Sequence, residues 1–397
     1  MKVLIINSVC GVGSTGRICE SIAKEVNKVG EAVIAYGRGN YHGPIKTYKI
    51  ETTIGVAIHG VQSRVFSNHG RSSKRATIRL ISYIEEFNPD VINIHNIHGY
   101  YLNYEILFNY FKSSQKKIVW TLHDQWPVSP HAAYIEEDEY GNSPIQINNR
   151  FELKEYPKTF FWNPSKKNYN LKKESFYSLS RKQMVVVTPS DWLKDFLNKT
   201  YMKKYSLMVI NNGIDLSTFR PNNIEKTPNK KILLGVANYW DRRKGLDFLL
   251  ELSMMLDDSY ELIIVGETKK DLSKYNITHI PRTNNVDELV NLYSNADIFI
   301  NPTLADNFPT TNLESLACGT PVITFSSGGS GEAITSKVGR VLSNKNSAEL
   351  YSAVKKINKN QEIISECLDK ASEYDEKKVF KLYVELFERL QNSDGDW

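Results

Sequence analysis

The stretch "NPTLADNFPTTNLESLACGTPVITF", residues 301–325, decides the fold. It begins at the end of one apolar segment, "ADIFINP", and finishes in another, "TPVITF", and both have the length of buried strands. The sequence between them predicts a short loop and then a helix that begins after Pro309. A strand, a helix and a second strand in this order indicate a parallel sheet covered by helices. The loop carries Asp306, and the first turns of the helix carry Glu314.

The same alternation of apolar strands and helices runs through both halves of the chain. In the first half we expect strands at 2–7, 31–37, 91–96, 117–124 and 184–190, and helices at 16–30, 76–90 and 191–201, the last capped by Ser190. In the second half we expect strands at 230–238, 261–266, 296–302 and 320–325, and helices at 245–256 and 286–294. Residues 134–175 are rich in Tyr, Asn and Lys with little periodicity, and they predict a long irregular excursion.

Length and linker composition predict two domains. A chain of 397 residues exceeds what one hydrophobic core usually organises, and "VINNGIDLSTFRPNNIEKTPNKK" has the composition of a linker. We therefore expect an α/β architecture of two doubly wound, Rossmann-like domains facing each other across a cleft, over residues 1–210 and 211–375. The amphipathic segment 376–397 is expected to pack back on the first domain. In such sheets ligands bind at the carboxyl ends of the strands, at the topological switch point.

Composition and charge narrow the class of protein. The apolar start is too short for a signal peptide, and no apolar run has the length of a membrane span, so we expect a cytoplasmic protein. The four cysteines are scattered, without metal-ligand spacing, and fit reduced thiols. Net charge is +5, but it is divided unevenly: residues 1–204 carry a net +10 and residues 205–397 a net −5. A basic half attracts anions, although it is also compatible with an ordinary solvated surface.

A glycine-rich turn, "GVGSTG", follows the first strand and precedes a helix. Gly11, Gly13 and Gly16 match the G-x-G-x-x-G pattern, which turns the chain tightly and directs N–H groups at an anion. A dinucleotide site remains an alternative, in which Arg38 at the end of the second strand would suit the 2′-phosphate of NADP. A P-loop is excluded because Arg17 stands where that motif needs lysine. A tight turn without any ligand is the other alternative.

The second half carries cations and carboxylates just after strands. Arg242, Arg243 and Lys244 follow the strand at 230–238, where cations suit a diphosphate. Asp306 and Glu314 lack the nearby His or carboxylate ligands of a metal site, so we expect no metal; "DGD" near the C-terminus lies in a frayed tail. A carboxylate accepts hydrogen bonds from adjacent sugar hydroxyls. Cations for phosphates and acids for hydroxyls together indicate a site for a nucleotide sugar.

Several segments resemble retaining glycosyltransferases of family 4, which have the GT-B fold of two Rossmann-like domains. The resemblance rests on "DNFPTTNLESLACGTPVITF", "RRKGLD", "NNGID" and "GSTGRI". Two further segments, "PDVINIHNIHGYYLN" and "VWTLHDQWPVSPH", resemble the branch that builds bacterial exopolysaccharide, capsule and O-antigen. The resemblance to family 4 spans almost the whole chain and is weakest over residues 134–175.

The resemblance implies roles for particular residues of the second half. Glu314 would hold the ribose hydroxyls of the donor and Asp306, in place of the usual glutamate, the hydroxyls of the donor sugar. Lys244 matches the diphosphate lysine, whereas Tyr239 stands where an arginine is usual, so Arg243 is expected to substitute for it. Backbone N–H groups near three further residues would help to hold sugar and phosphate: Asn307, Phe308 and Thr311.

In the first half the resemblance implies that Gly13 brings its backbone to the phosphate and that His123 contacts the donor sugar. From the residues alone, a histidine of the core, or one that only supports the site, is the less favoured alternative for His123. His95 and His98 are expected to shape the acceptor side or the core, with no role as metal ligands, and Asp124 is expected on the acceptor side.

The implied reaction is transfer of a sugar, with retained anomeric configuration, from a UDP- or GDP-sugar to a glycan or polyprenol-diphosphate-linked acceptor, without a cofactor. Alternatives are a sugar-nucleotide epimerase of the same fold, an NADP-binding oxidoreductase and a non-catalytic partner subunit. The last of these would have lost the acids and the lysine that this chain keeps. We expect no nucleic-acid partner.

Two sets of cations predict peripheral attachment to an anionic membrane surface, at its inner face. The first is Arg64, Arg71, Lys74, Arg75 and Arg79, and the second is Lys166, Lys167, Lys172, Lys173, Arg181 and Lys182.

Overall fold

The computed structural model describes residues 1–136, 159–160, 164–222 and 230–392. These residues form two compact units. The first comprises 1–135, 159–160, 164–211 and 379–392, and the second comprises 136 and 212–378 without the gap at 223–229. The "DGD" tail and most of the segment 134–164 lie outside the described residues.

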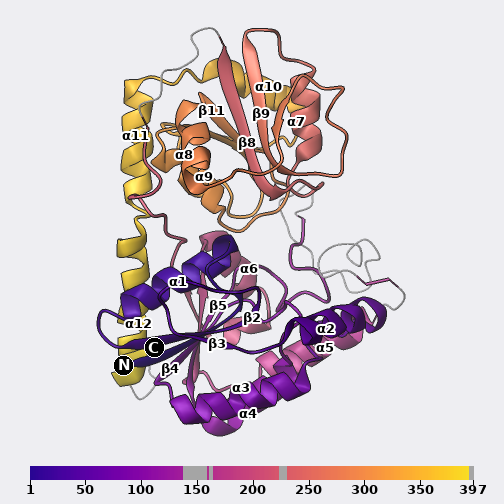
Figure 1. Cartoon of the computed structure of the whole chain (residues 1–397), viewed down its shortest axis with the longest axis vertical. Coiled ribbons are helices and arrows are strands. Elements are labelled where there is room, and N and C mark those ends of the chain that lie inside the picture. The colour runs from indigo at the N-terminus through magenta and orange to yellow at the C-terminus, as the bar shows by residue number, and fades with distance from the viewer. Residues whose placement is uncertain (137–158, 161–163, 223–229, 393–397) are drawn as a thin grey trace. The chain divides into compact units, whose positions relative to one another are not determined.

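The first unit is built on a seven-stranded parallel sheet (Figure 1). In spatial order its strands are β3 (Thr47–Lys49), β2 (Glu31–Arg38), β1 (Lys2–Val9), β4 (Val91–Ile94), β5 (Lys117–Thr121), β6 (Met184–Thr188) and β7 (Ser206–Val209). The order reverses between β1 and β4, which pair in register from Val3 with Val91. That reversal is the switch point at which α/β sheets bind ligands.

Successive side chains of each strand point to opposite faces of this sheet, and both faces are buried. Leu4 and Ile6 face one apolar cluster, and Val3 and Ile5 face the other. The first cluster is covered by α3 (Lys74–Phe87), α4 (Tyr104–Ser114), α5 (Ser165–Phe176) and α6 (Asp191–Asn198), and the second by α1 (Gly13–Val26) and α12 (Glu376–Asn392). The C-terminal helix therefore completes the core of the first unit, as its apolar stripe requires, and its Tyr383 shares a hydrogen bond of 3.2 Å with Thr121.

The second unit has a six-stranded parallel sheet with its own switch point between β8 and β11. Its strands in spatial order are β10 (Thr278–Ile280), β9 (Tyr260–Glu267), β8 (Lys231–Tyr239), β11 (Ile298–Asn301), β12 (Val322–Phe325) and β13 (Gly339–Leu342). One face packs on α8 (Val286–Asn295), α9 (Thr310–Ala317) and α11 (Gln361–Ser372), and the other on α7 (Leu246–Ser253) and α10 (Ser347–Lys356).

Most predicted strands are confirmed, and Ser190 caps α6 by accepting from the N–H of Leu193 at 3.1 Å. The expected irregular excursion is wrong over its last part, because α5 occupies Ser165–Phe176. That helix was hidden by its composition: it buries Asn168 and Lys172 beside only one large apolar side chain, Phe176. No helix in the described part of the chain combines the length and apolarity that crossing a bilayer requires.

Candidate functional site

In the second unit, two loops meet where the strand order reverses. One follows β8 and contains Asp241 to Lys244, and the other follows β11 and contains Pro302 to Asp306. The N–H of Leu304 donates to the carbonyl of Arg243 at 2.7 Å and joins them. Gly245 makes the approach possible, because its φ is +77° and a Cβ there would lie 2.0 Å from the carbonyl oxygen of Pro302.

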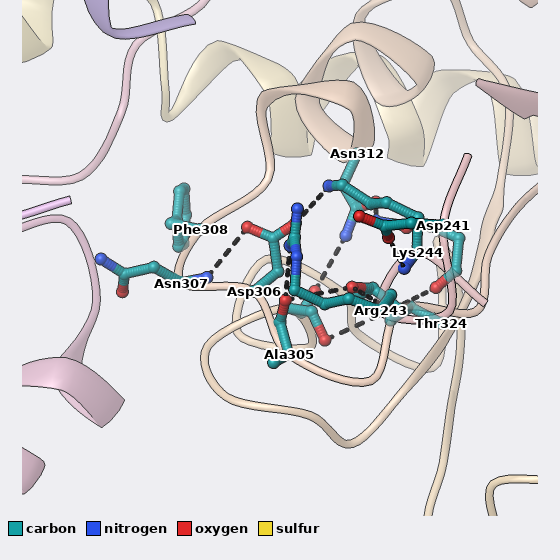
Figure 2. A network of polar contacts seen from close by, with 12 residues as sticks. Asp241, Arg243, Lys244, Ala305, Asp306, Asn307, Phe308, Asn312 and Thr324 are labelled. Atoms are coloured by element: carbon teal, nitrogen blue, oxygen red, sulfur yellow. Dashed lines mark hydrogen bonds and ion pairs between the residues drawn. The ribbon is translucent and has the colours of Figure 1, made fainter. Parts of the chain in front are cut away.

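A charged network occupies the junction of these loops (Figure 2). Lys244 Nζ lies 2.6 Å from Asp306 Oδ2, and Arg243 Nη1 lies 3.9 Å from the same oxygen. Arg243 also donates to the carbonyl of Ala305 at 2.8 Å. Burial alone would raise the pKa of Asp306, but Lys244 and Arg243 outweigh burial and hold it below the usual value. Asp306 thus pairs with two cations, and a second carboxylate, that of Asp241, accepts from the N–H of Lys244 at 3.0 Å.

Other residues of these loops that were expected to belong to the site have different surroundings. Arg242 turns to the carboxylate of Glu136 at 2.9 Å, and Tyr239 is exposed at the end of β8. The N–H of Asn307 donates to Asp306 Oδ1 at 2.9 Å. Phe308 is buried in the apolar cluster beneath α9.

Glu314 is placed by α9, whose first turn also contains the half-buried Thr311. The side chain of Glu314 is buried, and its Oε2 accepts a hydrogen bond of 3.0 Å from the hydroxyl of Tyr293 on α8. Sequence reasoning missed Tyr293, because nothing in the spacing of 21 residues indicates that the two helices meet. The bond fixes one carboxylate oxygen of Glu314.

In the first unit, the glycine-rich turn lies at the switch point beside β1. Gly13 opens α1 with φ +65°, and a Cβ built there would meet nothing within 4 Å. Gly16 instead packs tightly, since its Cβ would lie 3.2 Å from Val9 Cγ2. The exposed backbone at Gly13 is therefore open to a ligand, while Gly16 is required by packing.

The structure brings His95 and His123 together at the ends of β4 and β5. His95 Nδ1 lies 2.8 Å from His123 Nε2, and His95 Nε2 lies 2.8 Å from Asn93 Oδ1. Burial holds the pKa of His95 well below its usual value and lowers the pKa of His123 to about 4. Both rings are therefore neutral near pH 7.

The chain of hydrogen bonds assigns the tautomer of each ring. The amide nitrogen of Asn93 donates to the carbonyl of Val119 at 3.1 Å, which leaves Oδ1 to accept from His95 Nε2. His95 Nδ1 consequently accepts from His123 Nε2. His123 is left with Nδ1 as its hydrogen-bond acceptor, suited to a hydroxyl group.

His98 and Asp124 form a second pair, with Nε2 and Oδ2 separated by 2.7 Å. Asp124 Oδ1 also accepts from the N–H of Trp126 at 3.0 Å, so this carboxylate shapes the loop after β5. Within the residues that the structure describes, no cluster of three His, Cys, Asp or Glu side chains could hold a metal ion.

Two parallel Rossmann-like sheets with polar loops at both switch points define the GT-B class of glycosyltransferase fold. The chain belongs to glycosyltransferase family 4: the profile "Glycosyltransferase Family 4" matches residues 16–218, and "Glycosyl transferases group 1" matches residues 218–378. The resemblance read from the motifs is confirmed at the level of the family.

Two curated relatives act in the assembly of bacterial glycans, according to their names. The chain is 25% identical over 284 residues to the putative colanic acid biosynthesis glycosyl transferase WcaC of Escherichia coli, covering 66% of each chain. It is 26% identical over 242 residues to the N,N'-diacetylbacillosaminyl-diphospho-undecaprenol alpha-1,3-N-acetylgalactosaminyltransferase of Campylobacter jejuni, covering 54% of this chain and 63% of the relative. The match thus spans slightly less than two thirds of either relative.

Solved structures share the fold over nearly the whole chain. Sucrose-phosphate synthase from Thermosynechococcus elongatus has a TM-score of 0.69 at 13% identity, covering 98% of both chains. HepE of Anabaena, solved in complex with UDP-glucose, has a TM-score of 0.65 at 14% identity, covering 98% of this chain and 99% of that one.

Proposed function

We propose that this chain is a retaining glycosyltransferase that moves a sugar from a nucleoside-diphosphate sugar to a hydroxyl of a lipid-linked glycan in bacterial polysaccharide assembly. The observation that carries the proposal is the pairing of Lys244 with Asp306, beside Arg243, at the switch point of the second sheet. Cations held side by side at a loop junction suit the negative charge of a diphosphate. Family membership and the names of the relatives agree with this reaction.

Lys244 can bind the diphosphate without leaving Asp306. An ammonium group has three donors, and the bond to Asp306 uses one of them. Asp306 therefore holds Lys244 in position, with its remaining acceptor capacity available to a hydroxyl of the donor sugar. Arg243, held by Ala305, takes the role of the arginine that Tyr239 replaces.

Glu314 and His123 are the proposed contacts to hydroxyl groups of the donor. Tyr293 holds one carboxylate oxygen of Glu314, which orients the other for the ribose. His123 accepts a hydroxyl of the donor sugar at Nδ1, because Asn93 and His95 fix its tautomer. Gly13 lets the backbone of the first unit approach a phosphate.

The chemical step follows from where charge develops. As the bond to the leaving diphosphate breaks, positive charge grows on the sugar ring and negative charge on the phosphate oxygens. Lys244, Arg243 and the N-terminus of α9 stabilise the negative charge. The leaving phosphate takes the proton of the attacking hydroxyl, so no dedicated base is needed.

We further propose that the donor carries UDP or GDP and that the acceptor is linked to polyprenol diphosphate. Support for the nucleotide comes from HepE, which was solved with UDP-glucose, and support for the acceptor from the Campylobacter relative, whose name specifies undecaprenol diphosphate. A shallow basic cavity of about 510 Å³ in the first unit would suit an anionic headgroup. The cations that line it are Lys173, Arg181, Lys199, Lys203 and Lys204.

The location proposed for an enzyme with such an acceptor is the inner face of an anionic membrane, to which it would attach peripherally. One of the expected surface cations cannot contribute: Lys172 is buried and donates to the carbonyl of Trp126 at 2.7 Å. Arg71 is paired with Glu105 at 2.6 Å and contributes less than its neighbours. The others of the two sets lie on the surface of the first unit.

The nucleotide is tested by thermal shift with UDP-, GDP- and TDP-sugars. We expect one nucleotide class to raise Tm by several degrees in the wild-type protein and not in Lys244→Ala. Equal shifts in both proteins would remove Lys244 from the site. An NADP oxidoreductase would instead respond to NADP through the glycine-rich turn, with a change in nicotinamide absorbance on turnover.

A further inference from the structure

Helix α2 (Thr53–Phe66) is amphipathic, but its buried face is polar and its exposed face carries aliphatic side chains. Its buried residues are His59, Gly60 and Ser63. Three of its large aliphatic side chains point outward: Ile54, Ile58 and Val61 are 73%, 54% and 60% exposed, whereas Val56 is partly buried against the core. The three exposed positions are four and three residues apart and form one continuous stripe along the helix. A helix of a soluble domain ordinarily turns such a stripe to the core.

Specific polar contacts hold the helix in this orientation. His59 Nδ1 lies 2.9 Å from the hydroxyl of Ser73, and the hydroxyl of Thr159 donates to the carbonyl of Ser63 at 3.4 Å. Helix α5 lies beside α2 (Figure 1), and its Asn168 donates to the carbonyl of Ser67, just beyond α2, at 3.1 Å. The aliphatic stripe therefore stays outward because the opposite face of the helix is fixed by hydrogen bonds.

Exposed apolar side chains continue this surface beyond the stripe, and the same stretch of sequence is rich in cations. Phe66 and Phe160 are each at least 60% exposed, and the N–H of Phe160 donates to the carbonyl of Arg64 at 2.9 Å, which places it beside the end of α2. Residues 52–84 contain no Asp or Glu. They contain five cations: Arg64, Arg71, Lys74, Arg75 and Arg79.

We propose that α2 is a membrane-docking helix that lies in the plane of an anionic leaflet and inserts Ile54, Ile58 and Val61 among the acyl chains. The inference deepens, and rests on, the proposed action on a lipid-linked acceptor. An aliphatic stripe with cations and no carboxylate along the same stretch of chain is complementary to a surface that is apolar within and negative at its headgroups. Aliphatic side chains without Tyr or Trp anchors are less suited to a protein partner.

The stripe and the cations contribute differently to attachment, and salt separates them. Attraction between exposed cations and lipid headgroups is screened at high ionic strength, whereas burial of aliphatic side chains is not. The purified full chain is mixed with vesicles of phosphatidylcholine alone or with 30% phosphatidylglycerol, in about 0.1 M or 0.5 M NaCl, and bound protein is measured by flotation. We expect anionic vesicles to bind at least tenfold more protein than neutral ones at low salt.

Two sets of variants distinguish the contributions. Ile54→Ser, Ile58→Ser and Val61→Ser combined should reduce binding at least tenfold at both salt concentrations, without any change of charge. Arg75→Gln with Arg79→Gln should reduce it mainly at low salt. The matched control is Met254→Ser in the second unit, which removes an apolar side chain that is 68% exposed and should bind like wild type. Unaltered binding by the triple variant would overturn the proposal.

A probe on the helix gives an independent readout. All four native cysteines are buried, so a thiol introduced by Ile58→Cys can be labelled selectively with an environment-sensitive fluorophore. Anionic vesicles should shift its emission to the blue, and should leave the same label at Val29→Cys unchanged. A blue shift that appears with protein concentration and without vesicles, together with a dimer in sedimentation, would assign the stripe to a second copy of the chain and overturn membrane docking.

Nucleotide binding keeps this test separate from the proposed activity. The triple serine variant should retain the wild-type thermal shift with the donor nucleotide, which also shows that it is folded. Vesicle binding without any nucleotide binding would refute the proposed transferase and leave the docking helix. Nucleotide binding without vesicle binding would refute the docking helix and leave the proposed transferase.

Discussion

Lys244 and Asp306 are 62 residues apart in the chain, yet Lys244 Nζ lies 2.6 Å from Asp306 Oδ2. The pair connects the loops after β8 and β11, the two central strands of the second sheet. In the proposed reaction the pair gives the acid a role beyond contact with a sugar, because Asp306 would position the cation that we propose for the diphosphate. The shorter side chain of aspartate, compared with the glutamate usual in this motif, is thus compatible with a working site.

Replacing Asp306 tests whether its charge or its size matters. Asp306→Glu keeps a carboxylate near Lys244 and should retain at least about a tenth of the wild-type kcat/KM. Asp306→Ala leaves Lys244 without this partner and should lose about 100-fold or more, the magnitude typical of removing an electrostatic contact in a transition state. Steady-state kinetics with the donor identified by thermal shift measures both. Equal losses in the two variants would contradict a role for the carboxylate.

The junction of the two loops depends on Gly245. Gly245→Ala should destabilise the protein and weaken donor binding, because the added Cβ would lie 2.0 Å from the carbonyl oxygen of Pro302. Gly39→Ala is the matched control: Gly39 has nearly the same φ, +78°, but its Cβ would meet nothing within 4 Å. Urea denaturation and nucleotide titration should separate the two variants. Similar behaviour of both would mean that backbone strain alone, and not the close approach of the loops, requires glycine.

Glu314 is expected to be essential for activity and of modest importance for folding. Glu314→Ala should reduce transfer at least about 100-fold, while loss of its hydrogen bond with Tyr293 costs about 1–3 kcal/mol of stability. Tyr293→Phe removes the same hydrogen bond but leaves the carboxylate, and should keep most of the activity. The comparison requires kcat/KM and the free energy of unfolding for both variants. Threefold or smaller loss of activity in Glu314→Ala would remove it from the donor site.

Buried neutral histidines should make folding sensitive to acid. Burial lowers the pKa of His59 and His123 from 6.5 to about 4, and it holds the pKa of His69 and His95 well below the usual value. Above pH 6.5 neither the folded nor the unfolded chain binds these protons, so stability is complete. As the pH falls toward 4 only the unfolded chain binds them, which costs about 1.4 kcal/mol per pH unit for each histidine.

Urea denaturation between pH 7.5 and 4.5 measures this loss. In His59→Asn the slope of the free energy of unfolding against pH should be smaller by the contribution of one proton. His59 is the suitable position because it lies outside the proposed donor site. An unchanged slope in that variant would show that His59 is protonated in the folded protein.

Strands and charged motifs could be predicted from the sequence, because buried parallel strands are continuous apolar runs and their carboxyl ends recur at one edge of a sheet. Helix α2 could not, because its aliphatic side chains face outward and its buried face is polar. The pair Lys244–Asp306 and the bond between Tyr293 and Glu314 depend on tertiary packing that spacing does not encode. The contact between Asn93 and His95 did have a signal in the sequence: the two residues are two apart, as expected for side chains on one face of a strand.

The central claim is that the Lys244–Asp306 pair serves sugar transfer from a nucleoside diphosphate. The most direct measurement is release of nucleoside diphosphate from the donor, with and without a polyprenol-diphosphate-linked glycan, in wild type and Lys244→Ala. We predict release only when the acceptor is present, equimolar sugar on the lipid with retained configuration, and a loss of about 100-fold in the variant. Conversion of the donor into an epimeric sugar nucleotide without acceptor, or equal rates in both proteins, would contradict the account.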